Sequence, residues 1–86
     1  MTIFNVEYSA ESLSQLKILN KIIIKRIIKK VESTRVDPYQ FFKRLTGRPE
    51  YKLRVGDYRI IANIEQDKKI VFVRSIGHRK DVYKKL

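Results

Sequence analysis

The chain has no cysteine, so neither a disulfide framework nor a thiolate metal site can form within it. It has a single histidine, and its carboxylates are scattered, which leaves no recognisable metal-ligand cluster. No glycine-rich phosphate loop and no serine-nucleophile motif is present either. These absences disfavour metal catalysis and leave no cofactor to expect, and the lack of cysteine fits a reducing, cytoplasmic compartment.

Long apolar runs are also missing. Stretches such as Ile22–Ile24 are far too short to span a bilayer, and residues 1–8 lack the basic start and apolar run of a signal peptide. We therefore expect no membrane partner. With 86 residues, the chain is expected to form one domain over 1–86 around one small core.

Acidic residues are scarce. There are 9 Asp and Glu against 20 Lys and Arg, a net charge of +11 that favours polyanions and makes nucleic acid the first partner to consider. Residues 1–42 hold 7 basic and 4 acidic residues (+3), whereas residues 43–86 hold 13 basic and 5 acidic (+8). A general compositional bias toward Ile and Lys is the alternative explanation.

The first half of the chain is predicted to form a strand and a helical pair. Alternation of apolar and polar residues over 4–8 predicts a half-buried strand. Ser9 or Ser12 can cap the helix that follows, and the apolar stripe shifts near Asn20. We predict two helices joined there, with one bent helix as the alternative. Asp37-Pro38 then marks a helix stop and a loop.

Five cations lie along the second predicted helix, opposite its apolar stripe: Lys21, Lys25, Arg26, Lys29 and Lys30. Such a run is either the solvated side of an amphipathic helix or a face for nucleic acid. The sequence leaves both interpretations open.

The second half is predicted to form a three-stranded antiparallel meander. A hairpin is expected over 51–64 with its turn at Gly56-Asp57, and a third strand over 70–76 follows the turn 67–69. Residues 78–86 are predicted to form a short C-terminal helix or tail. The fold class is therefore α+β: a strand, a helical pair, the meander and a short helix.

The hairpin carries a cationic face. Lys52 and Arg54 alternate with Leu53 and Val55, so the two cations share one side of the strand. Prepositioned cations suit chemistry on a phosphodiester, where negative charge grows in the transition state. RNA brings its own nucleophile, the 2′-hydroxyl, and such a reaction requires a base, an acid and cations but no metal. The alternative is that both cations belong to the solvated face of an edge strand.

Candidates for proton transfer are few. Clustered cations favour the neutral forms of Lys and His, so Lys52 or His78 is a candidate base. Tyr83 is a candidate acid or a platform for stacking a base. His78 is equally compatible with a plain loop residue, and Tyr58 with a core residue.

Three segments of the chain resemble the RelE/ParE toxin superfamily: LTG at 45–47, YKLRVGDYRII at 51–61 and IGHRKDVY at 76–83. The paired signatures RVGDYR and GHRxxVY, at their usual separation, are more specific than either alone. The resemblance covers essentially the whole chain and implies a toxin of a type II toxin–antitoxin pair. Its RelE branch cleaves messenger RNA in the ribosomal A site by 2′-hydroxyl attack without a metal.

The resemblance also implies roles for individual residues. Lys52 matches a lysine that is a candidate base or phosphate binder, Arg59 and Arg79 match arginines that stabilise charge on the scissile phosphate, and Tyr83 matches the C-terminal tyrosine. Some members of the family carry a second lysine just before the strand that contains Lys52, and this chain has Glu50 at that position. The full set of candidates comprises a catalytic group (Lys52, Arg59, His78, Arg79, Tyr83) and an RNA-binding group (Arg54, Lys80, Lys84).

The implied partners are a RelB-like antitoxin, acidic and partly disordered, and the ribosome with its messenger RNA. A toxin–antitoxin heterotetramer is expected for the inhibited state. Two alternatives share the resemblance: a ParE-type inhibitor of DNA gyrase without nuclease activity, and a degenerate homologue that only binds its antitoxin.

Overall fold

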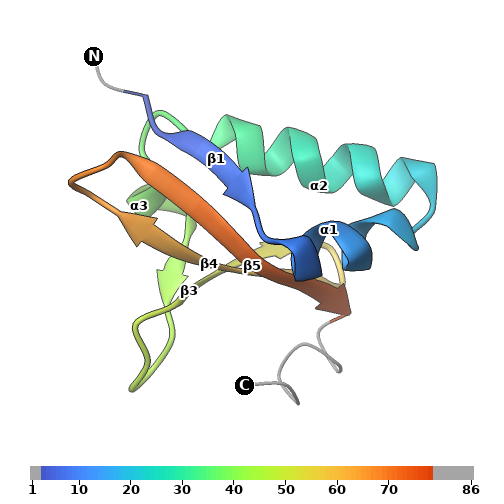
Figure 1. Ribbon diagram of the computed structural model, residues 1–86. Coiled ribbons are helices and arrows are strands. Elements are labelled where there is room, and N and C mark those ends of the chain that lie inside the picture. Colours follow the sequence, from blue (N-terminus) through green and yellow to red (C-terminus); the bar gives the residue numbers. More distant parts are fainter. Residues whose placement is uncertain (1–2, 79–86) are drawn as a thin grey trace.

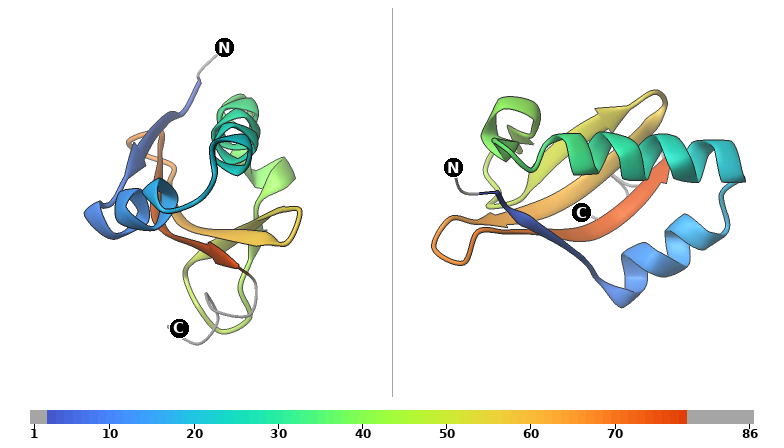
Figure 2. Two further views of the ribbon diagram at one scale, coloured as in Figure 1. Left: turned by 90° about the vertical axis from the view of Figure 1, so that its right-hand side faces the viewer. Right: turned by 90° about the horizontal axis from the view of Figure 1, so that it is seen from above.

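The computed structural model describes residues 3–78, which form a five-stranded sheet with helices on one of its faces (Figures 1 and 2). This two-layer arrangement confirms the α+β class. The elements, in chain order, are β1 (Asn5–Tyr8), α1 (Ala10–Lys17), α2 (Lys21–Ser33), α3 (Pro38–Phe41), β2 (Lys43–Arg44), β3 (Tyr51–Val55), β4 (Tyr58–Glu65) and β5 (Ile70–His78). No helix of this part of the chain is long and apolar enough to cross a membrane.

The strand order across the sheet is β1-β5-β4-β3-β2. β3, β4 and β5 pair antiparallel in chain order, which confirms the meander. β1 pairs parallel with β5, with Asn5 opposite Ile70 and Tyr8 opposite Val73. A parallel pair requires a long crossover between its strands, and here everything from α1 to β4 forms that connection.

Two separate helices form, as predicted from the shift in the apolar stripe. Ser9 caps α1 by accepting a hydrogen bond from the Ser12 backbone N–H at 3.0 Å. Asn20 caps α2 in the same way, accepting from the Ile23 N–H at 2.9 Å. Each cap satisfies a backbone donor that a helix start leaves without a partner, so α1 ends at Lys17 and α2 begins after Asn20.

The core lies between α2 and the sheet. Ile27 and Val31 of α2 are fully buried in one cluster with Leu53 of β3 and Ile60 of β4. Burying an isoleucine of this kind contributes roughly 1.5–3 kcal/mol of transfer free energy. The pattern confirms that Leu53 faces the core, and by alternation Lys52 and Arg54 face the opposite side of the sheet. We call that opposite side the open face.

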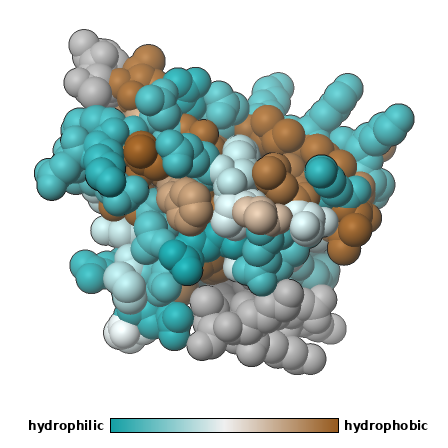
Figure 3. Space-filling model, in the orientation of Figure 1, coloured by the Kyte–Doolittle hydropathy of each residue, from teal (hydrophilic) through white to brown (hydrophobic). Residues whose placement is uncertain are grey.

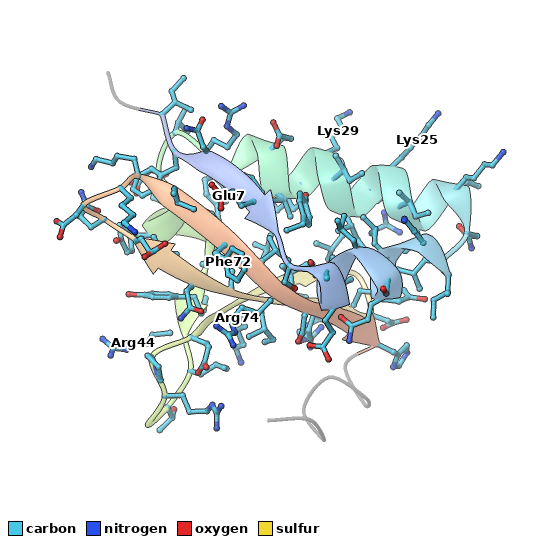
Figure 4. All side chains as sticks on the ribbon, viewed as in Figure 1. Glu7, Lys25, Lys29, Arg44, Phe72 and Arg74 are labelled. Carbon is cyan, nitrogen blue, oxygen red and sulfur yellow. The ribbon has the colours of Figure 1, made fainter. Side chains whose placement is uncertain are left out.

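A bulge in β5 changes the phase of its side chains. Ile61 pairs with Ser75 while the next residue, Ala62, pairs with Val73, so Arg74 is an extra residue on β5. Because one residue is inserted, Val73 and Ile76 both reach the core although simple alternation would separate them. Arg74 is left on the open face, where its Nη1 donates to Asn63 Oδ1 at 3.1 Å (Figure 4).

Three features differ from, or extend, the sequence-based prediction. The expected loop contains a short helix, α3, with Pro38 in its first turn, and Lys43 and Arg44 form a two-residue strand along β3. The third meander strand runs to His78 rather than ending at residue 76. The C-terminal helix predicted over 78–86 lies almost entirely outside the described residues.

The Tyr8 hydroxyl is a buried group with no hydrogen-bond partner among the described residues. Burial first, and the Glu32 carboxylate second, raise the pKa of Tyr8 above its ordinary value. Burying a hydroxyl without a partner costs free energy that a phenylalanine avoids. We expect Tyr8→Phe to leave the free energy of unfolding unchanged or to raise it by up to about 1 kcal/mol in urea titrations. A loss of that size would show that the hydroxyl has a stabilising partner.

Candidate nucleic-acid interface

The hairpin of β3 and β4 supplies the framework of the candidate site. Gly56 and Asp57 form the turn, as predicted, and Gly56 has φ of +60°, a conformation that side chains with a Cβ adopt at a cost. The register places Arg54 directly opposite Arg59. Cross-strand neighbours share one face of a sheet, so the hairpin holds two guanidinium groups side by side on the open face.

Both guanidinium groups bind the same turn. Arg54 Nε donates to the Gly56 carbonyl oxygen at 3.2 Å, and Arg59 Nη1 donates to that oxygen at 3.5 Å and to the Tyr58 carbonyl oxygen at 3.3 Å. One carbonyl therefore fixes the positions of two cations. Like charges held this close favour the binding of an anion between or beside them.

Arg59 is buried, with 9% of its surface exposed. A buried cation is normally paired with a carboxylate because desolvation of its charge is costly. Within residues 3–78 the two ion pairs are Arg35–Glu32 and Arg48–Glu50, and neither includes Arg59 or Arg54. Among residues 3–78, Arg59 therefore has carbonyl oxygens as hydrogen-bond acceptors and no carboxylate partner, which leaves its positive charge for a ligand.

Two lysines extend the cationic set along the strand. Lys52 is half-buried on β3, and its cross-strand neighbour on β2 is Lys43. A hollow of about 400 Å³ brings these residues together with Arg54 and Arg59. Its wall on the α2 side is formed by Lys30, Gln40 and Phe41. The structure thus gathers Lys52, Arg54 and Arg59, as the sequence predicted, around one hollow.

His78 lies elsewhere. The register places it opposite Tyr58, and their rings pack edge to face with centroids 5.8 Å apart. Tyr58 packs against the core on the α2 side of the sheet, so His78 belongs to that side while Arg59, one residue further along β4, belongs to the open face. The structure does not bring His78 together with the hairpin cations, because strand geometry turns adjacent side chains to opposite faces. Its role as a base remains a prediction.

Four of the candidate residues, Arg79, Lys80, Tyr83 and Lys84, lie outside the described residues, and their predicted roles stay predictions. Glu50, which aligns with a lysine of some relatives, accepts from Arg48 Nε at 3.2 Å. Within residues 3–78 no group of three or more His, Asp or Glu side chains is placed to hold a metal ion.

Sequence reasoning missed two members of the cationic face. Lys43 reaches it through the two-residue strand β2, which is too short to show any alternation. Arg74 reaches it through the bulge in β5. No local sequence pattern predicts that Lys43 or Arg74 lies on the cationic face. The only related signal in the sequence is the excess of positive charge in the second half of the chain.

Solved structures share this architecture. A chain of the RelBE2 toxin–antitoxin complex from Mycobacterium tuberculosis superposes with a TM-score of 0.80 at 19% identity, covering 90% of this chain and 99% of that one. A mutant of the Escherichia coli toxin RelE in the free state gives a TM-score of 0.78 at 26% identity, covering 98% and 93% of the two chains. The fold is that of the toxin subunits of toxin–antitoxin systems.

Sequence comparison agrees with the fold. Residues 6–83 match the family described as "ParE toxin of type II toxin-antitoxin system, parDE". A protein of Methanocaldococcus jannaschii, named "Putative toxin RelE1", is 33% identical over 86 residues, covering 94% of this chain and 96% of its own length. The chain belongs to the RelE/ParE family of type II toxin–antitoxin toxins.

Proposed function

We propose that the chain is a RelE-type endoribonuclease that cleaves messenger RNA in the ribosomal A site by attack of the RNA's own 2′-hydroxyl. The observation that carries the proposal is the pair of guanidinium groups, Arg54 and Arg59, fixed on one carbonyl oxygen without a carboxylate partner in the described part of the chain. The RelE names of its relatives favour this activity over gyrase inhibition.

The proposed chemistry assigns a role to each hairpin cation. Arg59 stabilises the charge that develops on the scissile phosphate, since a buried, prepositioned guanidinium needs little reorganisation during the reaction. Arg54 binds an adjacent phosphate oxygen. Lys52 lies in the same hollow and either accepts the 2′-hydroxyl proton or binds phosphate. Arg79 and Tyr83 complete the set, with Arg79 on the phosphate and Tyr83 stacking on a base or donating the leaving-group proton. No metal takes part.

The proposed inhibitor is an acidic antitoxin of the RelB kind. Similar solved structures include RelE–RelB complexes. Figure 3 shows apolar side chains gathered over α1 and the start of α2, and the exposed ones there include Leu13, Ile18 and Ile22, with 84% of Ile18 exposed. An apolar helix of the antitoxin would cover this patch while its acidic residues offset the basic hairpin. Both proteins would act in the cytoplasm and assemble as a heterotetramer.

Mapping cuts on programmed ribosomes tests the activity. Purified chain, separated from its antitoxin, is added to ribosomes that carry a defined messenger RNA, in the magnesium-containing buffer that intact ribosomes require. We expect cuts confined to the A-site codon, with a 2′,3′-cyclic phosphate or 3′-phosphate upstream and a 5′-hydroxyl downstream of each cut, which are the ends that attack by the 2′-hydroxyl leaves. Intact messenger RNA at stoichiometric toxin would contradict the proposal.

The gyrase and antitoxin-only alternatives give different results in parallel assays. A ParE-type toxin would inhibit DNA supercoiling by gyrase and leave the programmed messenger RNA intact. A degenerate homologue would do neither and would still bind its antitoxin.

A further inference from the structure

A groove with cations on both walls lies on the surface where α2 meets the β3–β4 hairpin. Two adjoining hollows, of about 430 Å³ and 230 Å³, make up this groove and share Arg26, Arg54, Val55 and Gly56 in their linings. The remaining residues of the larger hollow are Lys29, Lys30 and Ser33, and those of the smaller are Ile23, Asp57 and Tyr58. We refer to the two hollows together as the α2 groove.

Arg26 lines both hollows of this groove. A Cβ atom built on Gly56 would lie 3.5 Å from Arg26 Nη2, so the guanidinium group rests against the hairpin turn. The carbonyl oxygen of the same glycine binds Arg54 and Arg59. Three guanidinium groups from three elements therefore surround one turn.

Little negative charge opposes these cations. Among the described lining residues Asp57 is the only carboxylate, and neither ion pair of residues 3–78 involves Arg26, Lys30 or Arg54. The Lys30 ammonium instead lies 5.2 Å from the centre of the Phe41 ring. Cations facing one another across a groove repel, and a polyanion that binds between them removes that repulsion.

The α2 groove continues to the hairpin cations of the open face. Lys30 and Arg54 line the α2 groove and also the 400 Å³ hollow that contains Lys52 and Arg59. The continuation is possible because β2 pairs only with Tyr51 and Lys52, which leaves the outer edge of β3 beyond Lys52 without a strand partner in the described chain. A flexible single strand of nucleic acid can therefore pass from Arg59 around this edge of β3 to α2.

We infer that the α2 groove binds the sugar–phosphate backbone of single-stranded RNA, adjoining the segment held at Arg59. Arg26 and Lys30 are one helical turn apart, about 6 Å along the axis, which is comparable to the separation of successive phosphates in an extended strand. Basic grooves of this kind track a nucleic-acid backbone without regard to sequence. That the bound polyanion is RNA rests on the proposed function. That the α2 groove binds phosphate groups rests on the cations that line it.

This inference divides the cations of α2 into two groups. Lys25 and Lys29 point away from the sheet (Figure 4), and Lys21 and Lys25 line none of the three hollows. Arg26 lies against Gly56 of the hairpin turn, and Lys30 lies over the Phe41 ring of α3 and lines the same hollow as Arg54. The solvated-side interpretation thus applies to Lys21 and Lys25, and the nucleic-acid interpretation applies to Arg26 and Lys30.

The test compares two double variants of equal charge change, Arg26→Ala/Lys30→Ala and Lys21→Ala/Lys25→Ala. All four positions are exposed on one helix, and alanine is the best helix former, so both variants should fold, which circular dichroism checks. The probe is a fluorescent 15-mer of 2′-O-methyl RNA, which lacks the nucleophilic hydroxyl and cannot be cut by the proposed route. Binding is measured by fluorescence anisotropy over a series of salt concentrations.

We expect Arg26→Ala/Lys30→Ala to weaken binding of the probe about tenfold. The slope of log affinity against log salt concentration should decrease in magnitude by about 1.4, because two phosphate contacts on a single-stranded nucleic acid are lost. The Lys21→Ala/Lys25→Ala variant should keep the wild-type slope. Equal losses in both variants would overturn the inference, because only net charge would then matter. Competition by a glutamate 15-mer as strong as by unlabelled RNA would overturn it as well, in favour of an acidic peptide.

The same measurement separates this inference from the proposed activity. Binding of the uncleavable probe does not depend on catalysis. If the wild type binds the probe with the expected losses but leaves messenger RNA intact on ribosomes, the proposed function fails while the α2 groove stands. If messenger RNA is cut but both double variants bind like the wild type, the groove is excluded and the function stands.

Discussion

Replacing Arg59 with alanine is expected to reduce cleavage of messenger RNA on programmed ribosomes by about 10²–10³-fold, the usual effect of removing one prepositioned charge-stabilising donor. Arg59 is 9% exposed and is held by the Gly56 and Tyr58 carbonyl oxygens. Its guanidinium is therefore fixed before substrate arrives, and alanine removes both the charge and its fixed position. Single-turnover rates on ribosomes programmed with one defined codon provide the measurement.

Two further variants show whether the effect belongs to Arg59 or to charge in general. Arg59→Lys keeps the charge but loses the planar fork of donors, so it should recover only a small part of the lost rate. Arg74→Ala removes an exposed arginine of the same face and should change the rate only a few-fold. A wild-type rate in Arg59→Ala, or an equal loss in Arg74→Ala, would contradict the role given to Arg59. Antitoxin binding by each variant confirms that it is folded.

The second large effect concerns stability. Ile60 is fully buried in the central strand β4, between the core residues of β3 and β5. Ile60→Ala removes buried methyl groups and leaves a cavity, which together cost about 2–5 kcal/mol. A domain of this size has only about 5–10 kcal/mol of stability in total, so the variant should unfold at a much lower urea concentration than the wild type.

Ile22→Ala is the matched control, because 73% of Ile22 is exposed. The same chemical change at this surface position should alter the free energy of unfolding by no more than about 0.5 kcal/mol. If Ile22→Ala proved as costly as Ile60→Ala, the exposed position of Ile22 would be wrong. The control also has a functional use: a weaker affinity of Ile22→Ala for the antitoxin would support the apolar patch as its docking site.

Much of the secondary structure could be predicted because it depends on neighbours in the chain. The alternation around Leu53 places Lys52 and Arg54 on one face, Gly56 permits the turn, and Asn20 supplies the cap that separates the two helices. Each of these features follows from the periodicity or the side-chain chemistry of a few consecutive residues. The cationic hairpin was therefore visible in the sequence before any contact was known.

The composition of the candidate site could be predicted only in part. Lys52, Arg54 and Arg59 lie on one hairpin, so local register was sufficient to bring them together. The position of the His78 side chain depended on where β5 ends and on which face of the sheet each β5 residue occupies after the bulge. The structure places His78 beside Tyr58, on the other side of the sheet from the hairpin cations. Its proximity to Gly77 in the sequence gave no information about the face it occupies.

The sequence by itself determined β1, the two longer helices, the meander with its cationic hairpin and the excess of positive charge, but not α3 or β2. Only the tertiary structure decided the parallel pairing of β1 with β5, the bulge that turns Ile76 inward, and the meeting of Arg26 with the turn at Gly56. These contacts join residues far apart in the chain, and such pairs form because the packed core as a whole is stable, not because of any local preference. Local periodicity fixes which side of an element a residue occupies, whereas packing alone fixes what lies across from it.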